Sequence, residues 1–118
     1  MKHESQFTKD RVTFVSDGTK CYGYIYLPLD KLRAPCILLA NGFSGTMDYH
    51  LPSYAERFAI ASFSVLLFDY RYFGESEGEP RQLIDTRKQR EDIQSAIRFL
   101  KDHQSINSEK IVLLSEHM

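Results

Sequence analysis

Three short apolar runs, separated by stretches of different character, most constrain what this chain can fold into. They are CILLA (36–40), SVLLFD (64–69) and KIVLL (110–114). Continuous apolar runs of this length are typical of strands that are covered on both faces, as in parallel sheets. Parallel neighbours need crossover connections, which place helices on both faces. The sequence therefore predicts an α/β fold with a mostly parallel, doubly wound sheet.

The N-terminal part of the chain indicates a hairpin that leads into this sheet. Segments 11–17 (RVTFVSD) and 20–28 (KCYGYIYLP) are rich in β-branched and aromatic residues, and Gly18 lies between them. This pattern predicts two antiparallel strands joined by a tight turn near residues 17–19. We expect this antiparallel hairpin at the edge of the sheet.

Segment 51–62 (LPSYAERFAIAS) is predicted to form the first helix. Pro52 stands in its first turn, where proline is tolerated because the backbone N–H has no intrahelical partner there. A shared buried side is expected to contain Tyr54, Ala55, Phe58 and either Ala59 or Ala61.

A second helix is predicted after the loop 70–83, which contains glycines and a proline. Either Asp85 or Thr86 is suited to cap it, and Gln89 stands three residues beyond Thr86, as in a capping box. The apolar face has i, i+3, i+4 and i+7 spacing and consists of Ile93, Ala96, Ile97 and Leu100. The residues expected to point to water are Arg90, Asp92 and Lys101.

Composition and charge set limits on the class of protein. The 118 residues are 42% hydrophobic and 26% charged, which is ordinary for one globular domain or a piece of one. With 15 Lys and Arg against 16 Asp and Glu, the net charge of -1 gives no general attraction to nucleic acid or to an acidic membrane. The polar opening segment lacks the apolar core of a signal peptide, and no apolar run approaches the ~20 residues of a membrane span. We expect a cytoplasmic protein with neither nucleic acid nor membrane as a partner.

The two cysteines, Cys21 and Cys36, form no CxxC pair and have no histidine at metal-ligand spacing. The expected state is two reduced thiols packed in strands, and the alternative is a disulfide or a zinc site. We expect no metal and no cofactor.

The turn after the first apolar run is a candidate anion site. Gly42 and Gly45 in LLANGFSGTMD allow backbone N–H groups to face either a phosphate or the oxyanion of an acyl-transfer intermediate. The known phosphate motifs, GxxxxGK[ST] and GxGxxG, do not occur here. A tight turn without a ligand is the third interpretation.

Two segments together resemble the α/β-hydrolase superfamily. FDYRYFGESEGEP is similar to the D-x-R-G-x-G-x-S segment that follows the fourth strand of that family, with Tyr72 where glycine is usual. The matching positions are Asp69, Arg71, Gly74 and Ser76. NGFSG resembles the HG-x oxyanion turn, with Asn41 in place of histidine. The resemblance covers residues 10–114 and is nearest to Xaa-Pro dipeptidyl-peptidase-like, serine aminopeptidase-like and acetyl xylan esterase-like serine hydrolases.

The resemblance implies an oxyanion hole at this turn. One donor is the backbone N–H of Phe43, with Ser44 as a neighbouring candidate. Gly42 permits the turn, and Asn41 and Gly42 are candidate binding residues. Such a donor is worth ~3 kcal/mol of transition-state stabilisation.

The resemblance also gives roles to the loop after the 64–69 run. Asp69 and Arg71 either brace this loop through a salt bridge or hydrogen bonds, or contact substrate. Ser76 is not expected to be the nucleophile, because it lacks the strained strand-to-helix elbow and has no histidine partner in the pattern.

The family pattern predicts G-x-S-x-G after the 111–114 strand, but the sequence there is Ser115, Glu116 and His117, followed by Met118. The nucleophile and the later acid and histidine are absent. Residues 1–118 are therefore predicted to be a single partial α/β-hydrolase domain, truncated before the nucleophile elbow and inactive alone. The full-length parent would hydrolyse the ester, thioester, amide or peptide bond of a small-molecule or peptide acyl substrate.

A non-enzymatic alternative remains open: an inert remnant, or a small module that binds another chain through an exposed sheet edge. The strand at 111–114, or a neighbouring parallel strand, is expected to have an unpaired edge and a bare apolar face. The expected partners are a second copy of the chain or a complementing C-terminal chain.

Overall fold

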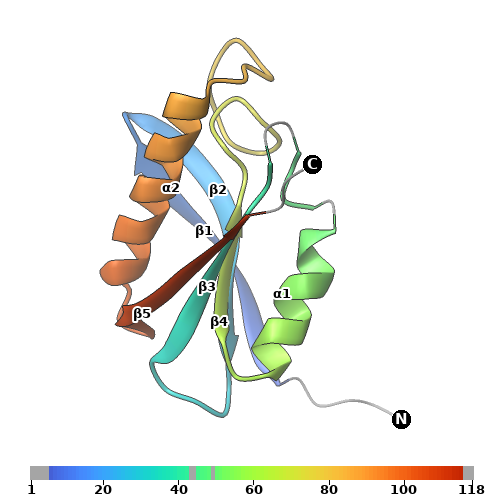
Figure 1. Ribbon diagram of the computed structural model, residues 1–118, viewed down its shortest axis with the longest axis vertical. Coiled ribbons are helices and arrows are strands. Elements are labelled where there is room, and N and C mark those ends of the chain that lie inside the picture. Colours follow the sequence, from blue (N-terminus) through green and yellow to red (C-terminus); the bar gives the residue numbers. More distant parts are fainter. Residues whose placement is uncertain (1–5, 43–44, 49, 116–118) are drawn as a thin grey trace.

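The computed structural model describes residues 6–42, 45–48 and 50–115, and within them the chain forms a five-stranded sheet with two helices (Figure 1). In chain order the elements are β1 (Phe7–Ser16), β2 (Thr19–Pro28), β3 (Ala34–Ala40), α1 (Leu51–Ile60), β4 (Ser64–Phe68), α2 (Thr86–Lys101) and β5 (Ile106–Ser115). Of the described helices, none is long and apolar enough to cross a membrane.

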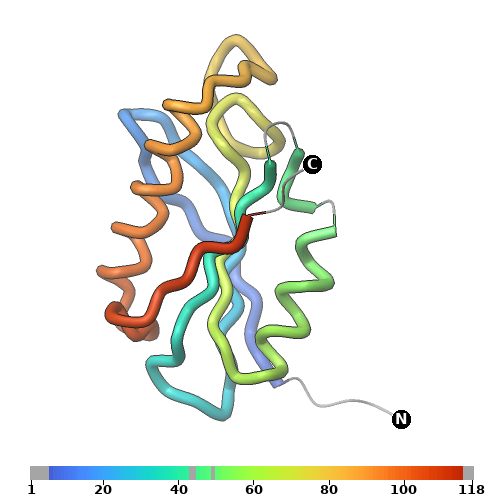
Figure 2. The backbone as a smooth tube through the Cα atoms, in the orientation of Figure 1, coloured from blue at the N-terminus to red at the C-terminus, as the bar shows by residue number. Residues whose placement is uncertain are grey.

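The strand order is β1-β2-β4-β3-β5. β1 and β2 pair antiparallel, β2 pairs antiparallel with β4, and β3 pairs in parallel with both β4 and β5. Helix α1 connects β3 to β4, whereas α2 carries the chain from β4 past β3 to β5, and the two helices lie on opposite faces of the sheet (Figures 1 and 2). The predicted fold class, an antiparallel hairpin leading into a doubly wound sheet, is confirmed.

The hairpin turn has the geometry that its sequence predicts. Asp17 and Gly18 are the two residues between β1 and β2, and their φ angles are +47° and +77°. Two positive φ angles in a two-residue loop match the twist of antiparallel strands, which favours Asp-Gly at these positions. β1 begins at Phe7, four residues earlier than predicted, so it pairs along the full length of β2.

The core has two layers, one on each face of the sheet. Along β3, Cys36, Leu38 and Ala40 belong to the apolar cluster beneath α2, and Ile37 and Leu39 to the cluster beneath α1. Successive side chains of a strand point to opposite faces, and both faces are covered here. This explains why the central strands are continuously apolar.

Helix α1 packs through a row of residues that agrees in part with the predicted one. The buried positions are Leu51, Ala55 and Ala59, at i, i+4 and i+8. The two alanines bring the helix backbone close to the sheet. The expectation that Tyr54 is buried is wrong, because its side chain is 48% exposed.

Helix α2 begins as predicted, with Asp85 as its cap. The Asp85 carboxylate accepts hydrogen bonds from the backbone N–H groups of Arg87 and Lys88. Ala96 and Leu100 are buried. The expectation that Asp92 faces water is wrong, because this residue is 1% exposed.

Strand β5 has one strand neighbour among the described residues, β3. Its apolar side chains at Val112, Leu113 and Leu114 are 41–54% exposed. The predicted unpaired edge with exposed apolar side chains is confirmed for the described part of the chain.

Candidate active site

The candidate site lies where β3 and β5 end side by side. Ala40 pairs with Ser115, so the residues that follow β3 emerge beside the end of β5. From β3 the chain turns through α1 to β4 on one side, and α2 then brings it to β5 on the other side. The carboxyl ends of strands at such a reversal of strand order are the usual ligand position in open α/β sheets. Asn41 and Gly42 occupy this position.

A small cavity of about 140 Å³ opens at this point. Its walls come from the end of β3, the loop after β4, the first turns of α2 and the end of β5. The lining residues are Asn41, Gly42, Tyr70, Thr86, Gln89, Arg90, Ile93 and Ser115.

Asn41 is held in the turn by its backbone. Its carbonyl accepts a hydrogen bond of 3.0 Å from the Tyr70 hydroxyl, and the residue is 4% exposed. Gly45 packs against its side chain, since a Cβ at that glycine would lie 3.0 Å from Asn41 Oδ1. The Asn41 Nδ2 group is buried without a hydrogen-bond partner among the described residues. An unpaired buried amide costs about 1–3 kcal/mol, which marks it as a polar group available to a ligand.

The predicted oxyanion donors themselves, Phe43 and Ser44, lie outside the described residues. The structure positions the start of the turn at Asn41 and Gly42 and its continuation from Gly45.

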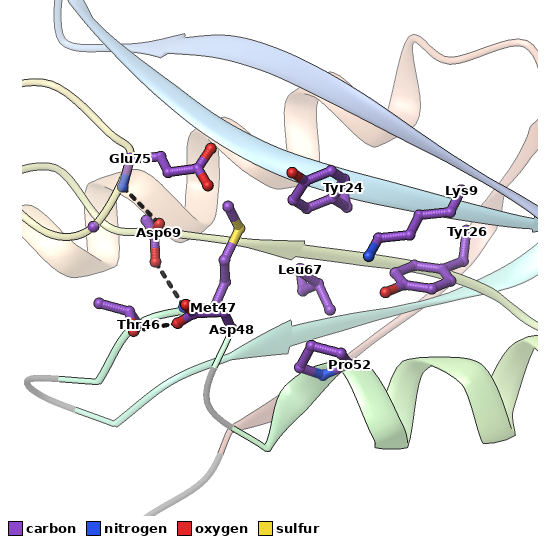
Figure 3. Close-up of a pocket in the computed structure, with 11 residues that line it drawn as sticks. Lys9, Tyr24, Tyr26, Thr46, Met47, Asp48, Pro52, Leu67, Asp69 and Glu75 are labelled. Atoms are coloured by element: carbon purple, nitrogen blue, oxygen red, sulfur yellow. Dashed lines mark hydrogen bonds between the residues drawn. The ribbon is translucent and has the colours of Figure 1, made fainter.

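Asp69 ties this turn to the loop that follows β4. It is 2% exposed, and its two carboxylate oxygens accept hydrogen bonds from the Met47 N–H at 2.7 Å and the Glu75 N–H at 2.8 Å (Figure 3). Burial raises the pKa of Asp69, and the two N–H donors partly offset this effect. Of the two roles left open by the sequence, these contacts are those of a bracing residue.

Ser76 completes the same brace. Its hydroxyl donates to the Asp69 carbonyl at 2.6 Å and accepts from the Tyr22 backbone N–H at 2.9 Å. The hydroxyl is therefore committed to the frame of the loop, which agrees with the expectation that Ser76 is not a nucleophile.

Arg71 braces the other side of the loop. Its side chain is 2% exposed, and its Nε lies 2.6 Å from Asp92 Oδ1. The Arg71 backbone N–H donates to the second Asp92 oxygen at 2.9 Å, and Ser16 Oγ donates to the first at 2.6 Å. Glu91 adds a contact of 2.9 Å to the guanidinium. Arg71 is thus locked into α2 rather than directed toward a substrate.

Sequence reasoning missed Asp92 as the partner of Arg71. A signal was present: Asp92 lies four residues before Ala96 and therefore on the apolar face of α2. An acidic residue on a buried helix face requires a cation, and the nearby loop supplies one.

The remaining predicted features are placed as follows. Cys21 and Cys36 are buried free thiols in β2 and β3, as expected. Within the described ranges, no group of His, Cys, Asp and Glu is arranged to hold a metal ion. Glu116 and His117 lie outside the described residues.

The strand order is that of the N-terminal portion of an α/β-hydrolase fold. Comparison with known proteins agrees. No protein-family model matches the chain. The α/β hydrolase GrgF from Penicillium sp. sh18 superposes with a TM-score of 0.87 and 31% sequence identity, over 92% of this chain and 37% of that chain. An acetyl xylan esterase from Paenibacillus sp. R4 shares the fold, with a TM-score of 0.76 at 19% identity, over 93% of this chain and 41% of that chain.

Curated relatives are similar in sequence. The quorum-quenching protein AidA of Acinetobacter baumannii is 41% identical over 86% of this chain and 34% of its own length. The thiohydrolase aneE of Aspergillus aculeatus is 40% identical over 95% of this chain and 35% of its own length. The chain spans about a third of the length of these relatives. It belongs to the α/β-hydrolase superfamily and corresponds to the N-terminal portion of that fold.

Proposed function

We propose that these residues form the oxyanion-hole part of a hydrolase that cleaves an ester, thioester, amide or peptide bond by acyl transfer. The observation that carries this proposal is the turn at Asn41–Gly42, which lies at the strand reversal between β3 and β5 and is held by Tyr70. Backbone N–H groups in such a turn meet the charge that develops on a carbonyl oxygen during nucleophilic attack.

The roles of the residues in this reaction are those that the family resemblance implies. The Phe43 N–H stabilises the tetrahedral oxyanion, while Asp69 and Arg71 hold the adjacent loop. The G-x-S-x-G motif that the family places after β5 does not occur at that position in the 118 residues, and neither do the acid and histidine that the family places after it. The match at 74–78 (GESEG) lies in the loop after β4, where the Ser76 hydroxyl is bonded to the Asp69 carbonyl and the Tyr22 N–H. We therefore propose that the chain is inactive alone and that a C-terminal segment supplies the nucleophile, acid and histidine.

A chimera tests this proposal. The segment of the thiohydrolase aneE that matches this chain is replaced by the matching residues of the chain, and the product is treated with a fluorophosphonate probe. We expect the chimera to be labelled and to hydrolyse a thioester, and the 118-residue chain alone to remain unlabelled. Thioesters are tested first because this relative is a thiohydrolase.

Two controls make the result interpretable. Intact aneE establishes the labelling expected of a complete site, and aneE without the matched segment establishes the background. A chimera that folds cooperatively but remains at background would contradict the proposal. Labelling of the chain alone would show that it carries its own nucleophile.

The alternative, a binding module, is favoured by one observation. Val112, Leu113 and Leu114 on β5 are 41–54% exposed beside a strand edge with no described neighbour. Exposed edges of this kind pair with other chains. We propose that the isolated chain self-associates through β5, or binds a complementing C-terminal chain there. Light scattering measures the mass of the wild type and of Val112→Lys in solution. The lysine places a charge on the strand edge, so this variant is expected to be monomeric. A wild type that remains monomeric at high concentration would refute self-association.

A further inference from the structure

A second cavity, of about 270 Å³, lies apart from the active site, between the N-terminal hairpin and the loops after β3 and β4 (Figure 3). Its lining includes none of Asn41, Gly42 and Ser115, which line the cavity at the end of β3. The lining residues are Lys9, Tyr24, Tyr26, Thr46, Met47, Asp48, Pro52, Leu67, Asp69, Gly74 and Glu75.

One polar group in this cavity is buried and unpartnered. Tyr26 is 0% exposed, and its hydroxyl has no hydrogen-bond partner among the described residues. Burial raises its pKa to about 12, with the Glu56 carboxylate acting in the same direction, so at neutral pH the hydroxyl is protonated and can donate. Buried polar groups are paired in most folded proteins, because leaving one unpaired costs stability. This hydroxyl therefore indicates a ligand that accepts a hydrogen bond.

A cation stands beside it. Lys9 on β1 is the direct register partner of Tyr26 on β2, and its ammonium lies 4.6 Å from the ring centroid of Tyr24 and 5.6 Å from that of Tyr26. Among the described residues, Lys9 forms no ion pair with a carboxylate. The two rings hold the ammonium over the cavity, and Figure 3 shows that the Lys9 nitrogen and the Tyr26 oxygen both point to the space bounded by Leu67 and Pro52.

The remaining walls define the ligand further. Met47, Leu67 and Pro52 provide apolar surface next to the two donors. The far end carries Asp48, Asp69 and Glu75, of which Glu75 is paired with Arg11. These carboxylates, and Glu56 near the Tyr26 hydroxyl, oppose negative charge on the ligand, and they oppose a dianion more strongly than a monoanion. The volume corresponds to roughly nine water molecules at ~30 Å³ each, so the ligand is small.

We propose that this cavity binds a small organic monocarboxylate, whose carboxylate is held by the Lys9 ammonium and the Tyr26 hydroxyl and whose short aliphatic chain rests on Leu67 and Pro52. The donors require an acceptor anion, and the acidic far end selects a monoanion over a phosphate dianion. This proposal does not rest on the proposed acyl-transfer chemistry, although the cavity shares Met47, Asp69 and Glu75 with the brace of the turn after β3.

The test is a titration of the ¹⁵N-labelled 118-residue chain with butyrate, followed by amide shifts and by equilibrium dialysis of labelled butyrate. The controls are butylammonium, which has the same shape and the opposite charge, and inorganic phosphate. We expect saturable binding of butyrate with shifts at Tyr26, Met47 and Leu67, and binding of either control at least tenfold weaker. Butylammonium or phosphate binding as tightly as butyrate, or no saturable butyrate binding by dialysis, would overturn the proposal.

Three variants locate the site. Tyr26→Phe keeps the ring and removes the hydroxyl, and it is expected to weaken butyrate binding about tenfold while leaving the ligand-free chain as stable as the wild type or more stable. Lys9→Gln should weaken binding by at least as much. Lys20→Gln, a lysine on the same hairpin that does not line the cavity, should have no effect. Unchanged butyrate binding in Tyr26→Phe would overturn the assignment, as would an equal loss in Lys20→Gln.

Discussion

Replacing Asp92 by asparagine is expected to destabilise the chain strongly, because it removes the charge that neutralises Arg71. The two side chains are 1% and 2% exposed, and their closest atoms are 2.6 Å apart. Asp92 also accepts hydrogen bonds from the Arg71 backbone N–H and from Ser16 Oγ. An asparagine retains one acceptor oxygen and turns an NH₂ group toward the remaining donors.

The magnitude follows from what remains around the guanidinium. Removing one partner of a buried ion pair costs about 3–5 kcal/mol. Glu91 and Asp17 still contact Arg71, at 2.9 and 3.6 Å, but their side chains are 47% and 75% exposed. Exposed partners of this kind each offset less than about 1 kcal/mol. We therefore expect a loss near the lower limit, about 3 kcal/mol, which is a large share of the ~5–15 kcal/mol that stabilises a typical domain.

Urea denaturation followed by circular dichroism measures this loss. With a slope of about 2 kcal/mol per molar, the midpoint of Asp92→Asn should fall by about 1.5 M. Glu91→Gln, which changes a neighbouring contact to the same guanidinium, should cost no more than about 1 kcal/mol. The double variant Arg71→Met/Asp92→Leu should be more stable than Asp92→Asn, because it leaves no unpaired buried charge. A loss below about 1 kcal/mol for Asp92→Asn would refute this reasoning.

Three further predictions concern the braces and the sheet. The pKa of Asp69 in the folded chain lies above its usual value of 3.8, so the folded state holds this proton more tightly than the unfolded state. The unfolding free energy of the wild type, measured relative to Asp69→Asn, should therefore fall as the pH rises from about 4 through the folded pKa. Denaturation curves that show a rise over this range would contradict the prediction. Burial raises the pKa values of Cys21 and Cys36 to about 12, so both thiols should resist a disulfide reagent in the native chain and react on unfolding, whereas rapid native reaction would show that the strands open. Gly23→Ala should cost about 2–3 kcal/mol in thermal or urea unfolding, because a Cβ there collides with the Leu67 carbonyl across the β2–β4 pair; a neutral effect would show that this pairing adjusts.

The elements that the sequence predicts well are those in which local pattern and tertiary environment agree. β3 and β4 lie between two helices, so their sequences are almost continuously apolar, and they can be recognised without an alternation of polar and apolar residues. The Asp17–Gly18 turn is fixed by backbone sterics alone. The order of these elements, with the motifs at their ends, was sufficient to predict the hydrolase fold.

The features that sequence did not predict depend on contacts between distant segments. Ala55 and Ala59 are buried in α1 as predicted, but Tyr54, which fits the same apolar pattern, is 48% exposed, and Leu51 takes part in the buried row. Asp92 is predicted from the sequence to be a surface residue, because the sequence does not show that Arg71 lies beside it in the fold. The second cavity depends on the register of β1, whose first four residues lie before the predicted strand.

The claim that Phe43 donates its backbone N–H to the oxyanion is tested most directly by two substitutions in the chimera with aneE. Phe43→Pro removes that N–H, and Phe43→Ala removes the side chain while keeping the N–H. The account predicts that kcat for thioester hydrolysis falls by ~10²–10³-fold in Phe43→Pro and stays near that of the unsubstituted chimera in Phe43→Ala. Equal rates in the two variants would contradict it.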